Sequence, residues 1–327
     1  MRKSILAAVA VATVLFAAGL VSPAVAQQQN YKFALSLGWS EGESGQHLLH
    51  GFQEAVKKMG GTLTSADAGY DAKRQSDQID AFIQSKPNAI FVTASDPAAI
   101  APAVKRAIDA GIPVFAADSL IPGVSVTTTA MSNNFGMGAY TAQFIAEKLG
   151  GKGNIALVDL PANETWDLRA DGLRWALQQY PDIKVVGVWS YNSTGATTPR
   201  QGVESLLTSH PDVQAIWCAW DGAAMEGALA LRAAGKEGVF TTGIDGGKQV
   251  FTHLNAGTGV ALSLAQSFYE MAYVDVFYAH ELLAGRKAPR VVITPVYAVT
   301  KELLKGTIPD DYDVPGRATA LGWRRVL

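Results

Sequence analysis

The sequence predicts an α/β protein built from two doubly wound lobes with parallel sheets, joined by a hinge of several strands. Two observations predict this fold. Short apolar runs alternate with amphipathic helical patterns along most of the 327 residues, which is typical of parallel strands linked by crossover helices. The same alternation starts again after Asn133 and after Gly150–Gly153, so a second unit of like build is expected.

The first lobe is predicted from five apolar runs that read as strands and from three helices between them. The predicted strands are FALSLG (33–38), TLTSADA (62–68), AIFVTA (89–94), IPVFAAD (112–118) and VSVTTTA (124–130). The predicted helices are Ser44–Met59, Ala72–Gln84 and Pro97–Asp109. Glycine or proline follows each helix closely, as expected where a helix ends.

The second lobe repeats this order. Its predicted helices are Gly138–Leu149, Trp166–Tyr180, Pro199–Thr208 and the helix after Trp220. Its predicted strands are NIALVDL (154–160), IKVVGVWSY (183–191), AIWCAW (215–220) and VFTTGI (239–244). We expect the strand LSLAQ (262–266), the helix Phe268–Ala284 and the segment VVITPVYAV (291–299) to carry the chain back between the lobes, whereas the tail after Gly306 receives no assignment.

These patterns predict three parts of the chain with definite boundaries. Residues 1–26 are predicted to be a signal peptide. Residues 27–132 with 267–295 form the first lobe, and residues 133–266 with 296–327 form the second. The cleft between two such lobes is the natural place for a ligand.

The stretch from Asp212 to Ala234 shows how a strand could deliver a side chain to that cleft. Val213–Ala219 is a short apolar run that predicts a buried strand, and Asp221 is placed to cap the helix that follows and ends near Gly235. The apolar stripe expected on that helix consists of Met225, Leu229 and Ala233. Because ligands bind beyond the carboxyl ends of parallel strands, Trp220 is expected at the site.

The beginning of the chain predicts export from the cytoplasm. Arg2 and Lys3 precede an apolar run from Ile5 to Val21, and a small-residue cleavage signal ends at Ala26. This order is typical of a secretory signal peptide, so we expect cleavage after Ala26 and a periplasmic location. An uncleaved membrane anchor is the competing interpretation, because the apolar run is long.

Composition excludes several function classes. Basic and acidic residues are nearly balanced, 27 to 29, and no basic patch predicts nucleic acid as a partner. The single cysteine, Cys218, lies in a predicted buried strand and allows no intramolecular disulfide. The five histidines show no spacing typical of metal ligands, and we expect neither a metal nor a cofactor.

Several segments together resemble periplasmic sugar-binding proteins of the ribose-binding type, over about Tyr31 to Val299. The matching segments are IPVFAADS, LRADG (168–172), HPDVQAIWCAWDGAAMEGALALRAAG (210–235), GIDG (243–246) and LSLAQ. The resemblance implies a monomeric protein that closes by a hinge around a small sugar. It also implies delivery of that sugar to the membrane subunits of an ATP-driven importer, and a chemoreceptor is a further possible partner.

The resemblance places the family's ligand positions on Asp118, Arg169, Trp220, Asp245 and Gln266. Carboxylates accept hydrogen bonds from sugar hydroxyls, a guanidinium donates from a planar fork, and an amide does both. The expected site is completed by Trp39, Ser40 and Ser119. We expect Trp39 and Trp220 to face each other across the ligand, because indole rings pack well on the C–H face of a sugar.

The chain also departs from the family at this site. Ser119 stands where an arginine is common and Trp220 where an asparagine is common, and the aromatic residue often found near Thr194 is missing. The first loop, Glu41–Gly45, lacks the usual asparagine and aromatic pair. These differences leave the ligand open among hexoses, deoxy or branched sugars and polyols.

Other functions remain possible on the same sequence. The segment GWSEG (38–42) fits G-x-S-x-G, so a serine hydrolase would use Ser40 with Asp245 and either His253 or His280. A sensor of a non-sugar ligand, such as a small signalling furanone, would share the fold and the cleft. A sugar-responsive repressor would need a DNA-binding headpiece where this chain has its predicted signal peptide.

Overall fold

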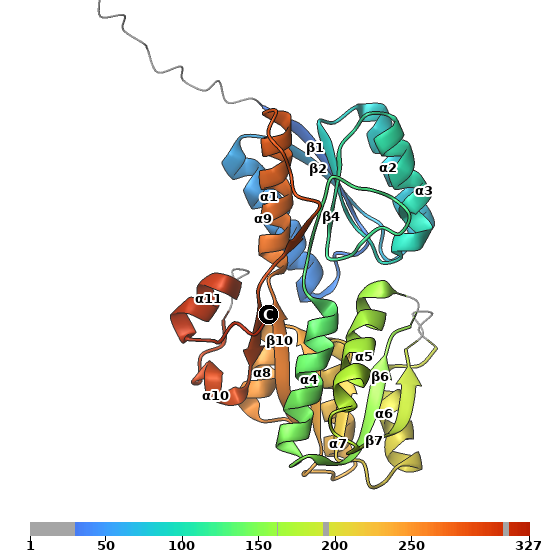
Figure 1. Cartoon of the computed structure of the whole chain (residues 1–327), viewed down its shortest axis with the longest axis vertical. Coiled ribbons are helices and arrows are strands. Elements are labelled where there is room, and N and C mark those ends of the chain that lie inside the picture. The colour runs from blue at the N-terminus through green and yellow to red at the C-terminus, as the bar shows by residue number, and fades with distance from the viewer. Residues whose placement is uncertain (1–29, 162, 192–195, 310–313) are drawn as a thin grey trace, which may run out of the picture.

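The computed structural model describes residues 30–161, 163–191, 196–309 and 314–327. The predicted signal peptide, its cleavage site and Thr194 therefore lie outside the described residues. The chain forms two lobes stacked along the long axis of the molecule (Figure 1). Each lobe contains a six-stranded sheet, which confirms the predicted α/β fold with two parallel-sheet units.

The first sheet has the strand order β11-β5-β4-β3-β1-β2, and all of its neighbouring strands are parallel. Its strands are β1 (Lys32–Leu37), β2 (Thr62–Asp67), β3 (Ala89–Thr93), β4 (Val114–Ala117), β5 (Thr128–Met131) and β11 (Val291–Ile293). Its helices are α1 (Gly42–Met59), α2 (Ala72–Ser85), α3 (Pro97–Asp109) and α9 (Phe268–Leu283). Helices α1 and α9 pack on one face around Phe52 and Met271, and α2 and α3 pack on the other around Ile79 and Ile100.

The second sheet has the corresponding order β12-β10-β9-β8-β6-β7, but β12 runs antiparallel to β10. Its strands are β6 (Lys152–Asp159), β7 (Asp182–Ser190), β8 (Ala215–Cys218), β9 (Phe240–Asp245), β10 (Val260–Gln266) and β12 (Val296–Val299). Its helices are α4 (Asn134–Lys148), α5 (Glu164–Leu177), α6 (Pro199–Ser209), α7 (Asp221–Ala233) and α8 (Lys248–Ala256). Cys218 is buried in β8 as a free thiol.

Three segments cross between the lobes, from β5 to α4, from β10 to α9 and from β11 to β12. Hydrogen bonds join these crossings to one another. The amide of Thr294 donates to the carbonyl oxygen of Met131 at 2.9 Å, and the hydroxyl of Ser267 donates to that of Pro295 at 2.8 Å. The hinge is therefore a connected unit of three strand ends rather than three separate linkers. The exact lobe boundaries at 132/133, 266/267 and 295/296 stay predictions.

The tail that the sequence left unassigned packs on the second lobe beside this hinge. It carries α10 (Lys301–Leu304) and α11 (Val314–Leu321), and Trp323 packs against Phe251 with ring centroids 5.3 Å apart. The amide of Val326 donates to the carbonyl oxygen of Val296 at 2.9 Å. Leu327 lies against Gly136 in the first turn of α4. The tail thus contacts two of the three crossings.

Helix α4 begins four residues before the predicted start at Gly138, and the reason bears on the site. The side chain of Asn133 caps the helix by accepting from the amide of Gly136 at 2.9 Å. Gly138 lies inside α4, where a Cβ atom would come within 1.8 Å of the carbonyl oxygen of Arg169, and a Cβ at Gly172 would come within 1.9 Å of that of Phe135. The two glycines let α4 and α5 approach closely, which places Arg169 beside Asn134 at the start of α4.

Two further expectations need correction. The carboxylate of Asp221 does not cap α7, because it is turned inward to accept from the amide of Gly246 and the hydroxyl of Ser263. Leu229 is exposed, and the buried face of α7 is formed by its small residues, such as Ala224 and Ala228. Helix α8 was not predicted, because it is short and no side chain caps its beginning. Within the described ranges, no helix is long and apolar enough to cross a membrane.

Candidate ligand-binding site

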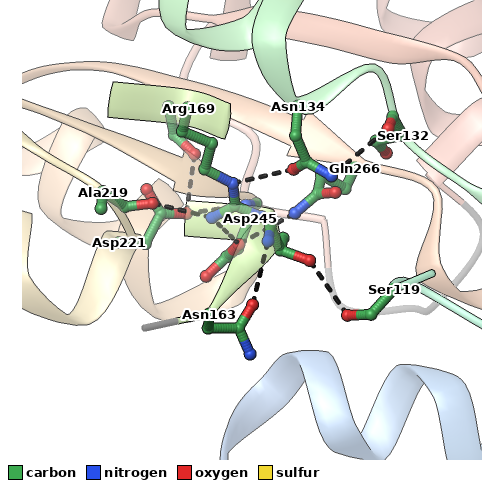
Figure 2. A network of polar contacts seen from close by, with 12 residues as sticks. Ser119, Ser132, Asn134, Asn163, Arg169, Ala219, Asp221, Asp245 and Gln266 are labelled. Atoms are coloured by element: carbon green, nitrogen blue, oxygen red, sulfur yellow. Dashed lines mark hydrogen bonds and ion pairs between the residues drawn. The ribbon is translucent and has the colours of Figure 1, made fainter. Parts of the chain in front are cut away.

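The carboxyl ends of strands from both sheets meet between the lobes and carry most of the predicted site residues. From the first lobe, Trp39 and Ser40 follow β1, and Asp118 and Ser119 follow β4. From the second lobe come Arg169 on α5, Trp220 after β8, and Asp245 and Gln266 at the ends of β9 and β10. Figure 2 shows four members of this group, Ser119, Arg169, Asp245 and Gln266, with Asp245 at the centre of the network. Segments far apart in the sequence therefore contribute to one place in the fold.

Arg169 is the centre of a hydrogen-bond network in the second lobe. Its side chain is 2% exposed, and its Nε donates to Oδ1 of Asn134 at 3.0 Å. Its Nη1 donates to the carbonyl oxygen of Ala219 at 2.7 Å and lies 3.3 Å from Oδ1 of Asp245 (Figure 2). These contacts fix the guanidinium plane, because three elements of the lobe hold it at once.

Asp245 is held by the same network. Its Oδ1 also accepts from Nε2 of Gln266 at 2.9 Å, and its side chain is 21% exposed. The pKa of Asp245 is raised to about 6, chiefly by burial and also by the charge of Asp118, while Arg169 acts in the opposite direction. Its backbone φ of 139° lies in a region that L-residues rarely adopt. Such strain is retained where the surrounding structure holds a group in a fixed position.

Asp118 is the first lobe's counterpart, but the structure gives it fewer partners. It is 7% exposed, its φ is 74°, and its backbone amide donates to the carbonyl oxygen of Ala130 at 2.8 Å. Its Oδ1 is buried and has no hydrogen-bond partner among the described residues. Burial raises the pKa of Asp118, and the nearby positive charge of Arg169 opposes that rise. This carboxyl is fixed in place with an acceptor oxygen left unused.

Hydrogen bonds also link the lobes directly. The hydroxyls of Ser119 and Thr165 share a bond of 2.9 Å, and Nδ2 of Asn163 donates to the carbonyl oxygen of Ser95 at 2.9 Å. The carboxylate of Glu43 accepts from the amide of Gln249 at 3.0 Å. The lobes thus meet on both sides of the buried carboxyls. Ser119, a predicted ligand contact, is occupied by this bond between lobes.

The aromatic residues form one pair in each lobe. Trp39 stacks on Tyr70 with ring centroids 6.4 Å apart and planes 17° apart, and Trp220 packs on Tyr191 at 5.5 Å. The ring contacts of Trp39 and Trp220 within the described chain are therefore to tyrosines of their own lobes, and the expected face-to-face arrangement of the two indoles stays a prediction. The position near Thr194, where the sequence analysis found no aromatic residue, lies outside the described residues.

Asp221 is a third buried carboxyl beside the site. Its Oδ2 accepts from the amide of Gly246 and from Oγ of Ser263, both at 2.7 Å. Burial raises its pKa to about 8, and the charge of Asp245 raises it further. The side chain therefore connects the start of α7 to Ser263 on β10 and to Gly246, the residue that follows Asp245.

The structure does not assemble the serine hydrolase site. The hydroxyl of Ser40 donates to Asp67. His253 lies 2.9 Å from the hydroxyl of Thr258 through its Nδ1, and His280 packs on Tyr31. Among the described residues, neither proposed base forms a hydrogen bond with Ser40, so the structure does not favour the hydrolase interpretation.

Five residues at this site were not predicted from the sequence: Tyr70, Asn134, Thr165, Tyr191 and Asp221. Asn134 follows the Asn133 cap, and because one asparagine is enough to cap a helix, the second could have indicated another role. The others had no signal of their own, because each matters through a partner distant in the sequence.

Two further features are a pocket away from this site and the arrangement of possible metal ligands. A pocket lined by Ile112, Ser125 and Arg290 lies at the opposite edge of the first sheet, where its strands begin. No group of three or more histidine, cysteine or acidic side chains within the described ranges is arranged to hold a metal ion.

Comparisons with known proteins agree with this geometry. A family model described as a periplasmic binding protein domain matches residues 33–287. The ribose import binding protein of Bacillus subtilis is 26% identical over 256 residues, which cover 78% of this chain and 82% of the relative. The D-apiose import binding protein of Actinobacillus succinogenes is 26% identical over 236 residues, which cover 71% and 76%. The structure of an ABC sugar transporter subunit from Rhodobacter sphaeroides has a TM-score of 0.77 at 26% identity, and the match covers 83% of this chain and 98% of that one.

Proposed function

This chain belongs to the periplasmic binding protein family, and from that premise we propose that it captures a small polyhydroxylated ligand and delivers it to an ABC importer. The ligand binds between the lobes and leaves chemically unchanged. The related ribose and D-apiose import binding proteins, and a related structure from Actinobacillus succinogenes with bound D-allose, support a sugar or polyol as the ligand class.

The observation that carries this proposal is the set of unused polar atoms between the lobes. Buried polar groups are normally hydrogen-bonded. At the carboxyl ends of the strands, however, several buried oxygens lack a partner among the described residues. Three of them are Oδ1 of Asp118, Oγ of Ser132 and Oε1 of Gln266. A ligand with several hydroxyl groups would provide donors to all three.

The proposed roles follow from the contacts. Arg169 donates to a ring or hydroxyl oxygen with the part of its fork that Asn134 and Ala219 leave free. Asp118 and Asp245 accept from hydroxyl groups, from one lobe each, and Gln266 serves both as donor and acceptor. Trp39 and Trp220 offer ring faces to the apolar side of the ligand, Ser40 lies beside Trp39, and the buried Ser119 joins the lobes next to Asp118.

Closure of the lobes is the signal that an importer reads in this proposal. The membrane subunits recognise the two lobes only when the ligand has drawn them together. The protein acts in the periplasm after removal of residues 1–26, as a monomer and not as an enzyme. A chemoreceptor would read the same closed surface.

A thermal-shift screen tests the proposal. The chain from Gln27 onward is melted with pentoses, hexoses, deoxy and branched sugars and polyols, with tryptophan emission read in parallel. A ligand at about 100 times its Kd stabilises the folded state by about 2.7 kcal/mol. We expect a selective rise in Tm with a change in emission, because Trp39 and Trp220 lie at the site.

Two variants control this screen. Asp245→Asn removes a proposed ligand contact and should abolish the shift, whereas Asp182→Asn, at the exposed start of β7, should retain it. A shift produced by furanones and by no sugar would replace the sugar ligand with the signalling alternative. No shift with either class would contradict the proposed function, and labelling of Ser40 by a fluorophosphonate would revive the hydrolase.

A further inference from the structure

The buried charges of the molecule are not balanced at the site between the lobes. Among the described residues, Arg169 is the one buried side chain that carries a permanent positive charge. Asp118 and Asp221 are buried beside it, and Asp245 is about four-fifths buried. Burial of an uncompensated charge is costly, so each carboxyl needs a partner or a proton.

Asp221 does not need the positive charge of Arg169. Its two hydrogen bonds come from Gly246 and Ser263, and burial raises its pKa to about 8, so it holds a proton near neutral pH. The imbalance therefore concerns Asp118 and Asp245, which share one guanidinium. Arg169 pairs with Asp245 at 3.3 Å. Asp118 is the carboxyl left without a cation.

The neighbourhood of Asp118 explains this shortage. The next residue, Ser119, carries no charge, and its hydroxyl bonds to Thr165 and not to Asp118. Arg169, the buried cation beside it, pairs with Asp245. Asp118 keeps a left-handed φ of 74° and a buried Oδ1 without a partner among the described residues.

Tyrosine rings from the two lobes lie within electrostatic reach of each other, and Tyr70 is also within reach of Asp245. Asp245 and Tyr191 both raise the pKa of Tyr70, after the larger effects of its burial and of Glu41 and Asp67. Tyr70, from the first lobe, therefore lies within electrostatic reach of Tyr191 and Asp245, from the second. Tyr191 in turn packs on Trp220. Aromatic faces combined with carboxylates are the groups that recognise an ammonium ion in proteins.

We propose that the ligand is a sugar or polyol that carries an ammonium group, which pairs with the buried carboxyl of Asp118. This inference rests on the proposed function, since it names the ligand class of the same site. The ammonium donates to the unused Oδ1 of Asp118, while Arg169, Asp245 and Gln266 bind the hydroxyl groups. The acidic side chains Glu41 and Asp67 at the entrance attract a cationic ligand from solution.

Matched pairs of probes test this inference by calorimetry at pH 7. The amines are D-glucosamine, D-galactosamine and 1-amino-1-deoxy-D-sorbitol, and their neutral partners are D-glucose, D-galactose and D-sorbitol. Each pair differs by one amino group in place of one hydroxyl. We expect at least one amine to bind about tenfold more tightly than its partner, as a charge-assisted contact would give.

Three variants assign that preference to Asp118. Asp118→Asn keeps the shape and removes the charge, so the preference should fall to about twofold or less. Asp275→Asn is the matched control, because Asp275 is a buried carboxyl on α9 that lies outside the site. It should leave the preference unchanged. Ser119→Arg supplies the missing cation and should reverse the preference toward the neutral sugar.

The outcomes separate this inference from the proposed function. If neutral sugars bind as tightly as their amines, or more tightly, the inference is wrong while the proposed function stands. An amine preference that survives Asp118→Asn also overturns it, because the charge would then be recognised elsewhere. If neither the amines nor the wider sugar and polyol panel bind, the proposed function itself fails.

Discussion

The two lobes share one strand order but prepare their halves of the site differently. In the second lobe, Arg169, Asn134, Asp245 and Gln266 are already joined by hydrogen bonds. In the first lobe, Asp118 has an unpartnered oxygen, and Ser119 finds its partner in the opposite lobe. The predicted site residues of the second lobe are therefore held by contacts within their own lobe, whereas Ser119 of the first lobe has its partner across the interface. Under the proposed function, we expect affinity and stability to depend on different residues in the two halves.

Arg169→Met should have the largest effect and should damage both properties. Removing one partner of a buried ion pair costs about 3–5 kcal/mol of unfolding free energy, because Asp245 is left buried without its cation. Ligand affinity should also fall below detection. Urea denaturation and calorimetry measure the two effects. Arg174→Met is the control, because Arg174 is 47% exposed and its pairs are worth about 1 kcal/mol or less.

Asp118→Asn should lower ligand affinity without lowering the stability of the ligand-free protein. Affinity should fall by about 100-fold, as when one partner of a buried polar contact is lost. The ligand-free protein should be as stable as the parent or more stable, because the variant removes a buried carboxyl with an unused oxygen. Tm without ligand and Kd with ligand check both parts. Equal losses of stability in Asp118→Asn and Arg169→Met would contradict the distinction between the lobes.

The stability of the protein should also depend on pH through Asp221 in the second lobe. The pKa of Asp221 is about 8 in the folded protein and near 3.8 when unfolded, so the folded state binds the extra proton between these values. The contribution of this group to stability therefore declines as pH rises from about 4 to about 8, by at most about 1.4 kcal/mol per pH unit. The free energy of unfolding of Asp221→Asn should therefore rise relative to that of the parent as the pH increases from about 4 to about 8, as urea titrations at several pH values would measure. A constant difference between the two proteins would show that Asp221 is ionised throughout.

Ser119→Ala should have the smallest effect and should act on closure alone. It removes the hydroxyl bond to Thr165, which is worth about 1 kcal/mol, so affinity should change by about fivefold or less. Small-angle scattering of the ligand-free protein should show a slightly larger radius of gyration. Ser76→Ala is the matched control, because its hydroxyl bonds to Ala72 within α2. An equal change in scattering from both variants would contradict a role in closure.

Much of the fold was predictable because local signals agreed with the tertiary structure. Helix α3 has the predicted bounds Pro97–Asp109, since Asp96 caps it, proline stands in its first turn and Gly111 follows it. Signals failed where a residue served a distant contact. Gly138 was interpreted as the start of a helix, whereas it provides room for Arg169 and α5 inside that helix.

The resemblance predicted which residues lie together between the lobes but not the contacts among them, and their role in ligand binding stays a prediction. Asp118, Arg169, Asp245 and Gln266 do converge, but no sequence pattern indicates that Arg169 donates to Ala219, fifty residues away. Asp221 showed the typical pattern of a helix cap, but the amide of Gly246 and the hydroxyl of Ser263, both distant in the sequence, hold its side chain inward. Tyr70 and Tyr191 were overlooked, because an isolated tyrosine has no periodic signal.

The position of Leu327 has a practical consequence for anyone who labels this protein. The last residues run beside Val296 and against Gly136, so a fusion joined after Leu327 would sit on the pivot of the molecule. An affinity tag placed there would interfere with bending, while one placed before Tyr31 would be remote from it. A fluorescent domain in the same position would be strained as the lobes move, which makes this end of the chain a natural attachment point for a biosensor.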